Sequence, residues 1–450
     1  MPCHDEITMS AKTTMTTEKQ RTSLNSVASA LVVLLATTTA GCGGGQQTPA
    51  PAAVTVEPSR IALAVAGRSN AAASVAAFGQ TVAAVWTAAT DDASDIFLSV
   101  SSDGGATFGA PVRVNDLDGD ARASGEQPAR VAVGVDYTIH VAWPAKRDGH
   151  TVIRYAASKD RGQAFSPAVT VAGATQTGAR GWHSLALGYD GAVHVAWLDG
   201  RSAAPMTHAH GNPGSKHAPS DGGPRQDIYH ASWKGDGPRS EHLVQANVCF
   251  CCKTAVATAG EHVYSAWRHI YPGSLRDIAV ARSNDNGVTF GAPIRVSEDG
   301  WKIDACPDDG PAMVADGHAG IHIAWPTLVA GDTPRKGIFY ASLSGLSGDA
   351  FTPRIRLDSG GSDPAHPQIA SDEHTNTVVV WDERAGETRR VVFRPVSDNV
   401  AQPPQMFSGD GVSYPVVAAG EGYWIVLWSA RGADGGSAIE GRRIPSPAKP

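Results

Sequence analysis

The stretch Ala192-Val193-His194-Val195-Ala196-Trp197 is a short run of small and β-branched residues that ends in tryptophan. Related runs lie 47 to 70 residues apart along the chain. They are VAAVW at Trp86, TIHVAW at Trp143, AVHVAW at Trp197, VYSAW at Trp267, GIHIAW at Trp325, TVVVW at Trp381 and YWIVLW at Trp428. Self-similarity at such a period indicates an array of one supersecondary unit, which buries its apolar faces only by stacking on its neighbours.

Each period contains three further strand-like segments. A strand such as PARVAV precedes the tryptophan strand, one such as DIFLSVS follows a polar loop after it, and a fourth such as PVRV completes the unit. Four antiparallel strands repeated radially leave only short edges exposed, as in a β-propeller. We therefore predict an all-β fold, a β-propeller of four-stranded blades, with seven blades and six as the alternative. The last repeat lacks an outer strand, which residues 54–58 (VTVEP) could supply.

A second motif, S-x-D-x-G-x-x-F, occurs between the third and fourth strands at residues 101–108, 158–165 and 283–290. Its carboxylate can accept backbone N–H bonds, its glycine permits positive φ, and its aromatic residue packs beneath the hairpin. We therefore expect its aspartates to be structural and not catalytic. They are Asp103, Asp160 and Asp285.

The repeats and the S-x-D-x-G-x-x-F motifs together resemble the sialidase-like (BNR or Asp-box repeat) propeller family over nearly all of residues 53–450. We call these motifs Asp-boxes. The resemblance implies a site near the axis, on the face opposite the Asp-boxes. Sialidases bind their substrate's carboxylate with three arginines and use a tyrosine nucleophile, a glutamate partner and an aspartate acid/base. The residues here that could fill such roles are Arg201, Arg268, Arg384, Asp382 and Tyr414. Ordinary Asp–Arg pairs at loop bases are the alternative, since the arginine motif usual at the N-terminus of that family is absent.

The N-terminus has the pattern of an export signal. Basic residues precede an apolar run, residues 27–36, that is too short to span a bilayer comfortably, and TAGC ending at Cys42 resembles a bacterial lipobox. We predict a lipoprotein signal peptide at residues 1–41, a lipidated Cys42 with a flexible tether over residues 42–52, and the propeller over residues 53–450. The expected location is the cell envelope, lipid-anchored at the outer membrane or facing the periplasm. An ordinary secretory signal with an incidental cysteine is the alternative.

Four further cysteines fall in connections between blades, on the predicted ligand face. They are Cys249, Cys251, Cys252 and Cys306. An even number of cysteines in an oxidising compartment suits disulfides. Four converging sulfurs would also suit a soft metal, copper or zinc. The C-x-C-C spacing matches no zinc-ribbon or haem-attachment pattern, so the sequence favours disulfides and keeps metal binding as the alternative.

Several histidines could share that site. A Gly/Pro-rich insertion, residues 202–226, has no evident packing role and could cap the face or help bind a metal, although a solvated surface loop is the simpler interpretation. By register, two histidines outside the insertion fall on the same face. The candidates are His183, His208, His210, His217 and His269.

Composition limits the classes of partner. The net charge of -7 is dispersed without a basic tract, which argues against a nucleic-acid partner. The membrane, through the lipid anchor, and a carbohydrate or small ligand remain as expected partners. The sequence favours a ligand-binding module with a Cys/His-containing site. An exo-glycosidase of the sialidase type, acting on acidic terminal sugars, and a soft-metal binding protein are the alternatives.

Overall fold

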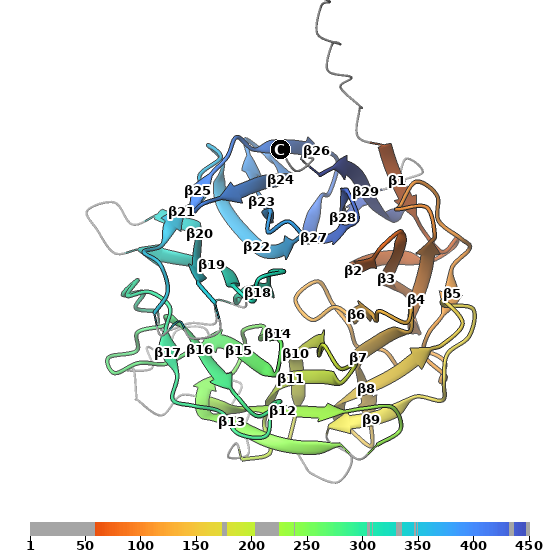
Figure 1. The fold of residues 1–450 in the computed structure, drawn as a ribbon. Helices are drawn as coiled ribbons and strands as arrows, with labels where there is room; N and C mark the ends of the chain where they lie inside the picture. The colour runs from red at the N-terminus through yellow and green to blue at the C-terminus, as the bar shows by residue number, and fades with distance from the viewer. Residues whose placement is uncertain are drawn as a thin grey trace, which may run out of the picture. The chain divides into compact units, whose positions relative to one another are not determined.

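The computed structural model is a ring of seven blades, each a four-stranded antiparallel sheet (Figure 1). It describes residues 59–446 apart from 173–177, 203–224, 238, 304–306, 308, 330–334, 346–347, 349 and 432–435. The predicted all-β propeller is confirmed, with seven blades and not six. Within the described residues, no helix is both long enough and apolar enough to span a bilayer.

The blades repeat one strand order from the axis outward. The inner strands are β2 (Ser69–Phe78), β6 (Arg130–Val133), β10 (Arg180–Leu187), β14 (Ala255–Ala259), β18 (Ala312–Ala315), β22 (Ser362–Ser371) and β27 (Ser413–Gly420). The second strands are β3 (Thr81–Ala89), β7 (Ile139–Arg147), β11 (Val193–Asp199), β15 (His262–Arg268), β19 (Ile321–Val329), β23 (Thr377–Ala385) and β28 (Tyr423–Arg431). The tryptophan strands are therefore the second strands of their blades, as predicted.

The outer half of each blade is more variable. The third strands are β4 (Ser94–Ser101), β8 (His150–Ser158), β12 (Arg225–Trp233), β16 (Ile278–Ser283), β20 (Arg335–Leu343), β24 (Thr388–Ser397) and β29 (Ser437–Pro445). The outer strands are β5 (Val112–Arg113), β9 (Val169–Ala172), β13 (Ser240–Cys249), β17 (Ile294–Arg295), β21 (Ile355–Arg356), β25 (Val400–Ala401) and β1 (Ser59–Leu63), and β26 (Gln405–Ser408) also pairs with β24.

Strand β1 closes the ring. It pairs antiparallel with β29, with Ile61 opposite Gly441, so the last blade takes its outer strand from the N-terminal end of the described chain. The sequence predicted this closure but assigned it to residues 54–58, which lie outside the described residues. The pairing begins at Ser59, and the buried side chains of Ile61 and Leu63 join the core between the last and first blades.

The seven tryptophans of the repeated second-strand motif lie at the centres of the packing between blades, and each is at most 1% exposed. The second strands are buried on both faces because every sheet packs between two neighbours. Polar residues satisfy several indoles: the Nε1–H of Trp197 donates to Asp199 Oδ2 at 2.8 Å and that of Trp381 to Glu383 Oε2 at 3.0 Å. The acidic residues that follow these tryptophans thus have a structural partner.

Each Asp-box folds as a hydrogen-bonded turn. In the first, Ser101 Oγ donates to Asp103 Oδ1 at 2.7 Å and the Thr107 backbone N–H donates to the same oxygen at 2.9 Å. Hydrogen bonds from Thr107 and Ser101 lower the pKa of Asp103 to about 2. Gly105 has a φ of +84°, and a Cβ there would lie 2.3 Å from Ile425 Cδ1 on the neighbouring blade. Asp160 and Asp285 accept equivalent bonds from Ser158 and Ser283, both at 2.7 Å.

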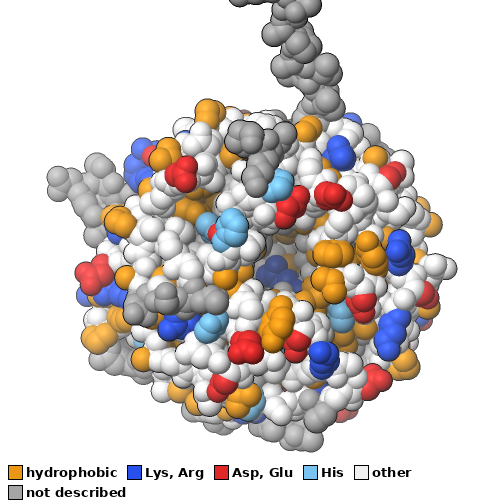
Figure 2. Space-filling view, viewed as in Figure 1, with side chains coloured by type: hydrophobic (Ala, Val, Ile, Leu, Met, Phe, Trp, Pro, Cys, Tyr) orange, Lys and Arg blue, Asp and Glu red, His pale blue; other side chains and the backbone are white. Residues whose placement is uncertain are grey.

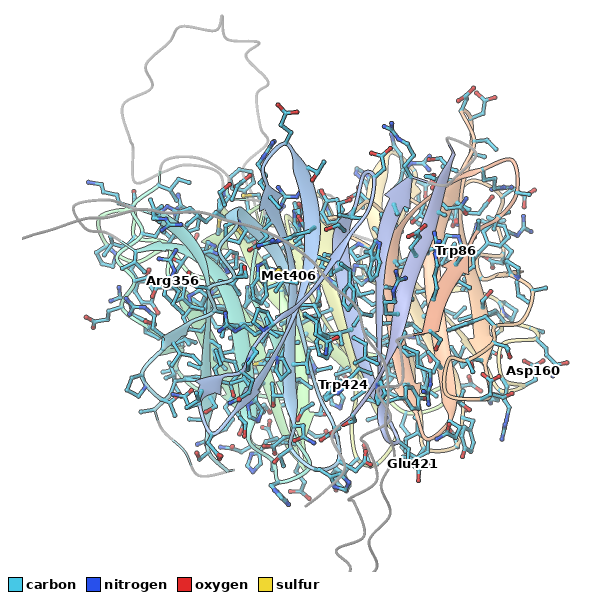
Figure 3. The ribbon with its side chains drawn as sticks, turned by 90° about the horizontal axis from the view of Figure 1, so that it is seen from above. Trp86, Asp160, Arg356, Met406, Glu421 and Trp424 are labelled. Atoms are coloured by element: carbon cyan, nitrogen blue, oxygen red, sulfur yellow. The ribbon has the colours of Figure 1, made fainter. Side chains whose placement is uncertain are left out.

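The Asp-box turns lie on the side of the disc where the inner strands end. The backbone N–H of Gly104 donates to the carbonyl of Gln80, in the β2–β3 hairpin, at 2.8 Å. In Figure 3, Asp160 and Glu421, which lies between β27 and β28, are both below Trp86. The inner strands therefore begin on the opposite side, together with the connections between blades.

Candidate functional site

The side of the disc where the inner strands begin carries an irregularity that the repeat pattern did not predict. Four inner strands contain β-bulges, two of them in β22, and in each bulge one residue other than glycine has a positive φ. These residues are Ala72 (57°), Trp182 (56°), Asp363 (48°), His366 (57°) and Tyr414 (52°). Such backbone strain persists only where the surroundings enforce it, and bulges re-aim side chains next to active sites.

Two of the bulge residues contact each other. The rings of His366 and Tyr414 lie with their centroids 4.1 Å apart, although the residues belong to neighbouring blades. His366 is held between two carboxylates, with Nδ1 2.7 Å from Asp382 Oδ2 and Nε2 3.0 Å from Glu126 Oε1. Asp382 is fully buried and also accepts the Tyr414 backbone N–H at 3.0 Å. Arg389 Nε donates to its other oxygen at 2.5 Å.

These contacts set the charges of the pair. Burial disfavours the imidazolium of His366, but hydrogen bonds to Asp382 and Glu126 and the charge of Asp309 outweigh it and raise the pKa of His366 to about 9. His366 is therefore cationic at neutral pH. Burial and the adjacent carboxylates, Glu126 first, raise the pKa of Tyr414 to about 12. Tyr414 is therefore a neutral phenol at neutral pH, and the Glu126 carboxylate lies beside it.

A buried ion pair extends this group across the axis. Lys253 Nζ lies 3.2 Å from Asp309 Oδ1 and donates to the Pro367 carbonyl at 2.9 Å. Asp309 Oδ2 accepts the backbone N–H of His366 at 2.6 Å, so the lysine and the carboxylate both brace the bulge that carries the imidazole. We call the group Glu126, Lys253, Asp309, His366, Asp382 and Tyr414 the axial cluster. Its members come from five of the seven blades.

A narrow pocket of about 10 Å³, room for about one water molecule, lies over the axial cluster. Its lining includes Glu126, Arg130, Lys253, His366 and Tyr414. Arg130 Nε donates to the His183 carbonyl at 3.3 Å, and burial lowers the pKa of Arg130 to about 10, which still leaves it cationic at neutral pH. Figure 2 shows the molecule hollowed at its centre with a basic side chain inside the hollow.

Glycine makes the close packing of this pocket possible. A Cβ on Gly125 would lie 2.4 Å from Tyr414 Cε2, so the backbone of Gly125 lies directly against the phenol ring. A Cβ on Gly310 would lie 2.2 Å from the Lys253 carbonyl oxygen. The positions of Tyr414 and Lys253 are therefore fixed by backbone contact as well as by hydrogen bonds.

The sequence-derived catalytic candidates separate into two groups. Asp382 and Tyr414 belong to the axial cluster, and buried Arg268 braces it by donating from Nη2 to the Asp309 carbonyl at 3.3 Å. Arg201 instead pairs with Asp199 and Glu241, both at 2.6 Å. Arg384 is about half exposed, with Nε 3.9 Å from Asp363 Oδ2. The three arginines thus have separate partners on three blades, and no contact among the described residues joins them.

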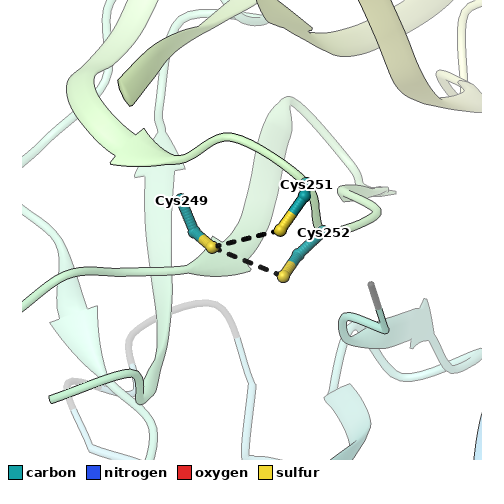
Figure 4. Close-up of side chains that lie close together, drawn as sticks. All are labelled: Cys249, Cys251 and Cys252. Atoms are coloured by element: carbon teal, nitrogen blue, oxygen red, sulfur yellow. Dashed lines mark hydrogen bonds between the residues drawn. The ribbon is translucent and has the colours of Figure 1, made fainter. Parts of the chain in front are cut away.

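The three described cysteines form a buried cluster between β13 and β14 (Figure 4). We call Cys249, Cys251 and Cys252 the cysteine cluster. Cys249 Sγ lies 3.6 Å from Cys252 Sγ and 3.9 Å from Cys251 Sγ, so none of the three is bonded to another. Cys249 and Cys252 are free thiols, whereas Cys251 is not. Cys306 lies outside the described residues, as does Cys42.

The predicted histidine candidates have other surroundings. His183 is buried in the β10 bulge with Nε2 3.1 Å from the Ala142 carbonyl, and burial lowers its pKa to about 3. His269 Nδ1 accepts the indole N–H of Trp267 at 3.1 Å. Among the described residues, the one group placed to hold a metal consists of the three cysteines without a histidine. His208, His210 and His217 lie outside the described residues.

Sequence reasoning missed four members of the axial cluster: Glu126, Lys253, Asp309 and His366. A signal for them exists in the repeat, because several inner strands contain a proline or follow one closely. The dipeptides are Gln127-Pro128, Gly310-Pro311, His366-Pro367 and Tyr414-Pro415. Each cluster member from these strands lies within two residues of such a proline, a position that the propeller topology brings to the axis.

Comparison with known proteins places the fold but not the activity. No protein-family model and no curated protein matches the sequence. Among solved structures, an ulvan lyase of a polysaccharide lyase family is 9% identical with a TM-score of 0.51, over 84% of this chain and 94% of its own. A Dyadobacter fermentans protein of unknown function is 14% identical, over 73% and 97%, with a TM-score of 0.48. A Streptococcus pneumoniae NanB sialidase variant is 9% identical, over 81% and 83%, with a TM-score of 0.45. The comparison with the ulvan lyase therefore agrees with the propeller fold and says nothing of the activity.

Proposed function

We propose that the axial cluster binds a saccharide with an acidic group and hydrolyses its glycosidic bond. The observation that carries this proposal is the Glu126 carboxylate, which lies beside the Tyr414 phenol and 3.0 Å from the imidazolium of His366, whose ring packs on that of Tyr414. A phenol beside a carboxylate base suits a retaining glycosidase that uses tyrosine as its nucleophile, with His366 in the place of the carboxylic acid that such enzymes use as the proton donor. The sequence alone had favoured binding without catalysis.

The proposed reaction has two balanced steps. The Tyr414 oxygen attacks the anomeric carbon and its proton passes to Glu126, while the glycosidic bond breaks and the leaving oxygen takes a proton from His366. Water then attacks the anomeric carbon and gives a proton to His366, and the Tyr414 oxygen departs and recovers its proton from Glu126. The pKa of His366, about 9, keeps the donor protonated at neutral pH. Asp382 and Asp309 are positioning residues that hold the imidazole and the bulges.

The pocket cations suit an anionic group on the sugar. Arg130, Lys253 and His366 line the same pocket, and Arg130 and His366 carry positive charge at neutral pH. A guanidinium can bind a carboxylate or sulfate through two N–H groups, and a buried setting strengthens that attraction. The arginine of this pocket, Arg130, is not one of the three that the family resemblance implied, but the expected acidic substrate is the same.

Purified mature protein should be tested on fluorogenic sialosides and uronosides and on acidic oligosaccharides, with Tyr414→Phe and Glu126→Gln as variants. We expect turnover that each variant lowers at least a hundredfold, with Arg130→Met raising KM for acidic but not neutral sugars. Exposed Tyr189→Phe is the matched control. Absence of both turnover and saccharide binding would refute the proposal, whereas binding without turnover would refute its catalytic step.

We further propose that the chain is exported and anchored in the cell envelope through a lipid on Cys42. The lipobox-like TAGC, the preceding apolar run and the Gly- and Pro-rich composition of residues 42–52 support this proposal. Metabolic labelling with a palmitate analogue should mark the wild-type protein and not Cys42→Ser, which should appear in the soluble envelope fraction. Equal labelling of both proteins would exclude Cys42 as the anchor.

A further inference from the structure

We propose that Cys249 and Cys252 form a binding site for a soft monovalent metal ion, Cu(I). Both thiols are free, each residue is 2% exposed, and the two sulfurs lie 3.6 Å apart. Two sulfurs bound to one metal at about 2.3 Å each lie no more than about 4.6 Å apart, so little rearrangement is needed. This inference stands apart from the proposed glycosidase, which uses neither thiol.

The local fold preorganises the two sulfurs. Strand β13 ends at Cys249, and a tight turn over Phe250 and Cys251 brings Cys252 back beneath it before β14. The turn follows Asn247, whose φ is +60° and whose backbone N–H donates to Asp227 Oδ1 at 3.0 Å. The separation in sequence is C-x-x-C, and Figure 4 shows both sulfurs on the same side of the turn.

Positive charge lies near the two sulfurs, because the guanidinium groups of Arg276 and Arg268 both act on Cys249. Each thiol releases its proton when a metal ion binds the sulfur. One Cu(I) with two thiolates carries a net negative charge, which the two guanidinium groups would offset.

The donor set selects the ion. Among the described residues, the metal-capable group contains sulfur alone, the donor type that soft ions prefer. Cu(I) is soft and accepts two or three thiolates. The cluster packs against Trp182, Phe250 and Ile270, an apolar setting that suits a low coordination number without water. Cys251 is not a free thiol and is outside the proposed pair.

The test is an anaerobic Cu(I) titration of reduced mature protein against a chromophoric chelator, with zinc titrated in parallel. We expect one tightly bound Cu(I) per chain, at least a hundredfold weaker binding in Cys249→Ser and in Cys252→Ser, and unchanged binding in Met406→Leu, which removes an exposed sulfur elsewhere. Thermal unfolding identifies variants that fail to fold. For the wild type, X-ray absorption should show copper bound by sulfur alone. Binding that survives both cysteine variants, copper with nitrogen or oxygen ligands, or zinc bound in preference to Cu(I), would overturn the proposal.

Discussion

Gly125 offers a way to test the axial cluster without removing any of its chemical groups. A methyl group at this position would overlap the Tyr414 ring, with 2.4 Å to Cε2 and 2.5 Å to Cζ, so Gly125→Ala must displace the phenol from Glu126. We expect this variant to lose at least tenfold in saccharide turnover or binding. Gly109→Ala is the control, since its Cβ would meet nothing closer than 3.5 Å. Equal activity of both variants would mean that the position of Tyr414 is not critical.

His366 should make stability depend on pH. Its pKa is about 9 in the folded protein, above the ordinary value of 6.5, so the folded state binds the proton more tightly. The resulting stabilisation is complete below pH 6.5 and disappears as the pH rises through 9. We expect the free energy of unfolding to fall by on the order of 3 kcal/mol between pH 6.5 and 10, measured by urea denaturation. His366→Gln should flatten this part of the profile; a profile as steep as the wild type would assign the effect to another group.

The Asp-box glycines belong to the contacts between blades. Gly162 has a φ of +87°, and a Cβ there would lie 2.6 Å from Leu98 Cδ2 and 2.8 Å from Val100 Cγ2 on the neighbouring blade. We expect Gly162→Ala to lower the free energy of unfolding by about 2 to 4 kcal/mol, from backbone strain and overpacking together. In a double-mutant cycle, adding Leu98→Ala to Gly162→Ala should remove the part of the loss in free energy that comes from overpacking. The part that comes from backbone strain at residue 162 should remain. Purely additive losses would show that the two blades do not meet at this contact.

The strands themselves show why the fold was predictable and the site was not. The Trp197 and Trp381 strands could be recognised because their alternation and their buried indole recur in every blade, and radial packing is the arrangement that buries both faces of such strands. The bulges at His366 and Tyr414 break the alternation by inserting unpaired residues, so a period-two pattern places these side chains wrongly or not at all. Tyr414 was found by analogy, but its partner Glu126 lies in a connection between blades, where no periodicity applies.

Closure of the ring ties the stability of the whole propeller to strand β1. Ile61 and Leu63, 4% and 7% exposed, fill the core between the last and first blades, and β27 of that same last blade carries Tyr414. Truncating a buried Ile or Leu to Ala costs about 2 to 5 kcal/mol, so Ile61→Ala with Leu63→Ala should lower the denaturation midpoint strongly. Saccharide binding should weaken at denaturant concentrations that leave the wild type intact.

Arg60→Ala on the same strand is the matched control for closure. Its side chain is 66% exposed and pairs with Glu440 at 2.6 Å, so its loss should cost less than about 1 kcal/mol. Tryptophan fluorescence during urea unfolding measures the wild type and both variants, because a buried tryptophan lies in the second strand of every blade. If the Ile61/Leu63 double variant unfolded in one transition with the midpoint of Arg60→Ala, β1 would be a peripheral strand and the ring would be held closed by its other blades. A separate early transition would instead mean that the last blade detaches first, and Tyr414 would leave the axial cluster before the remaining blades unfold.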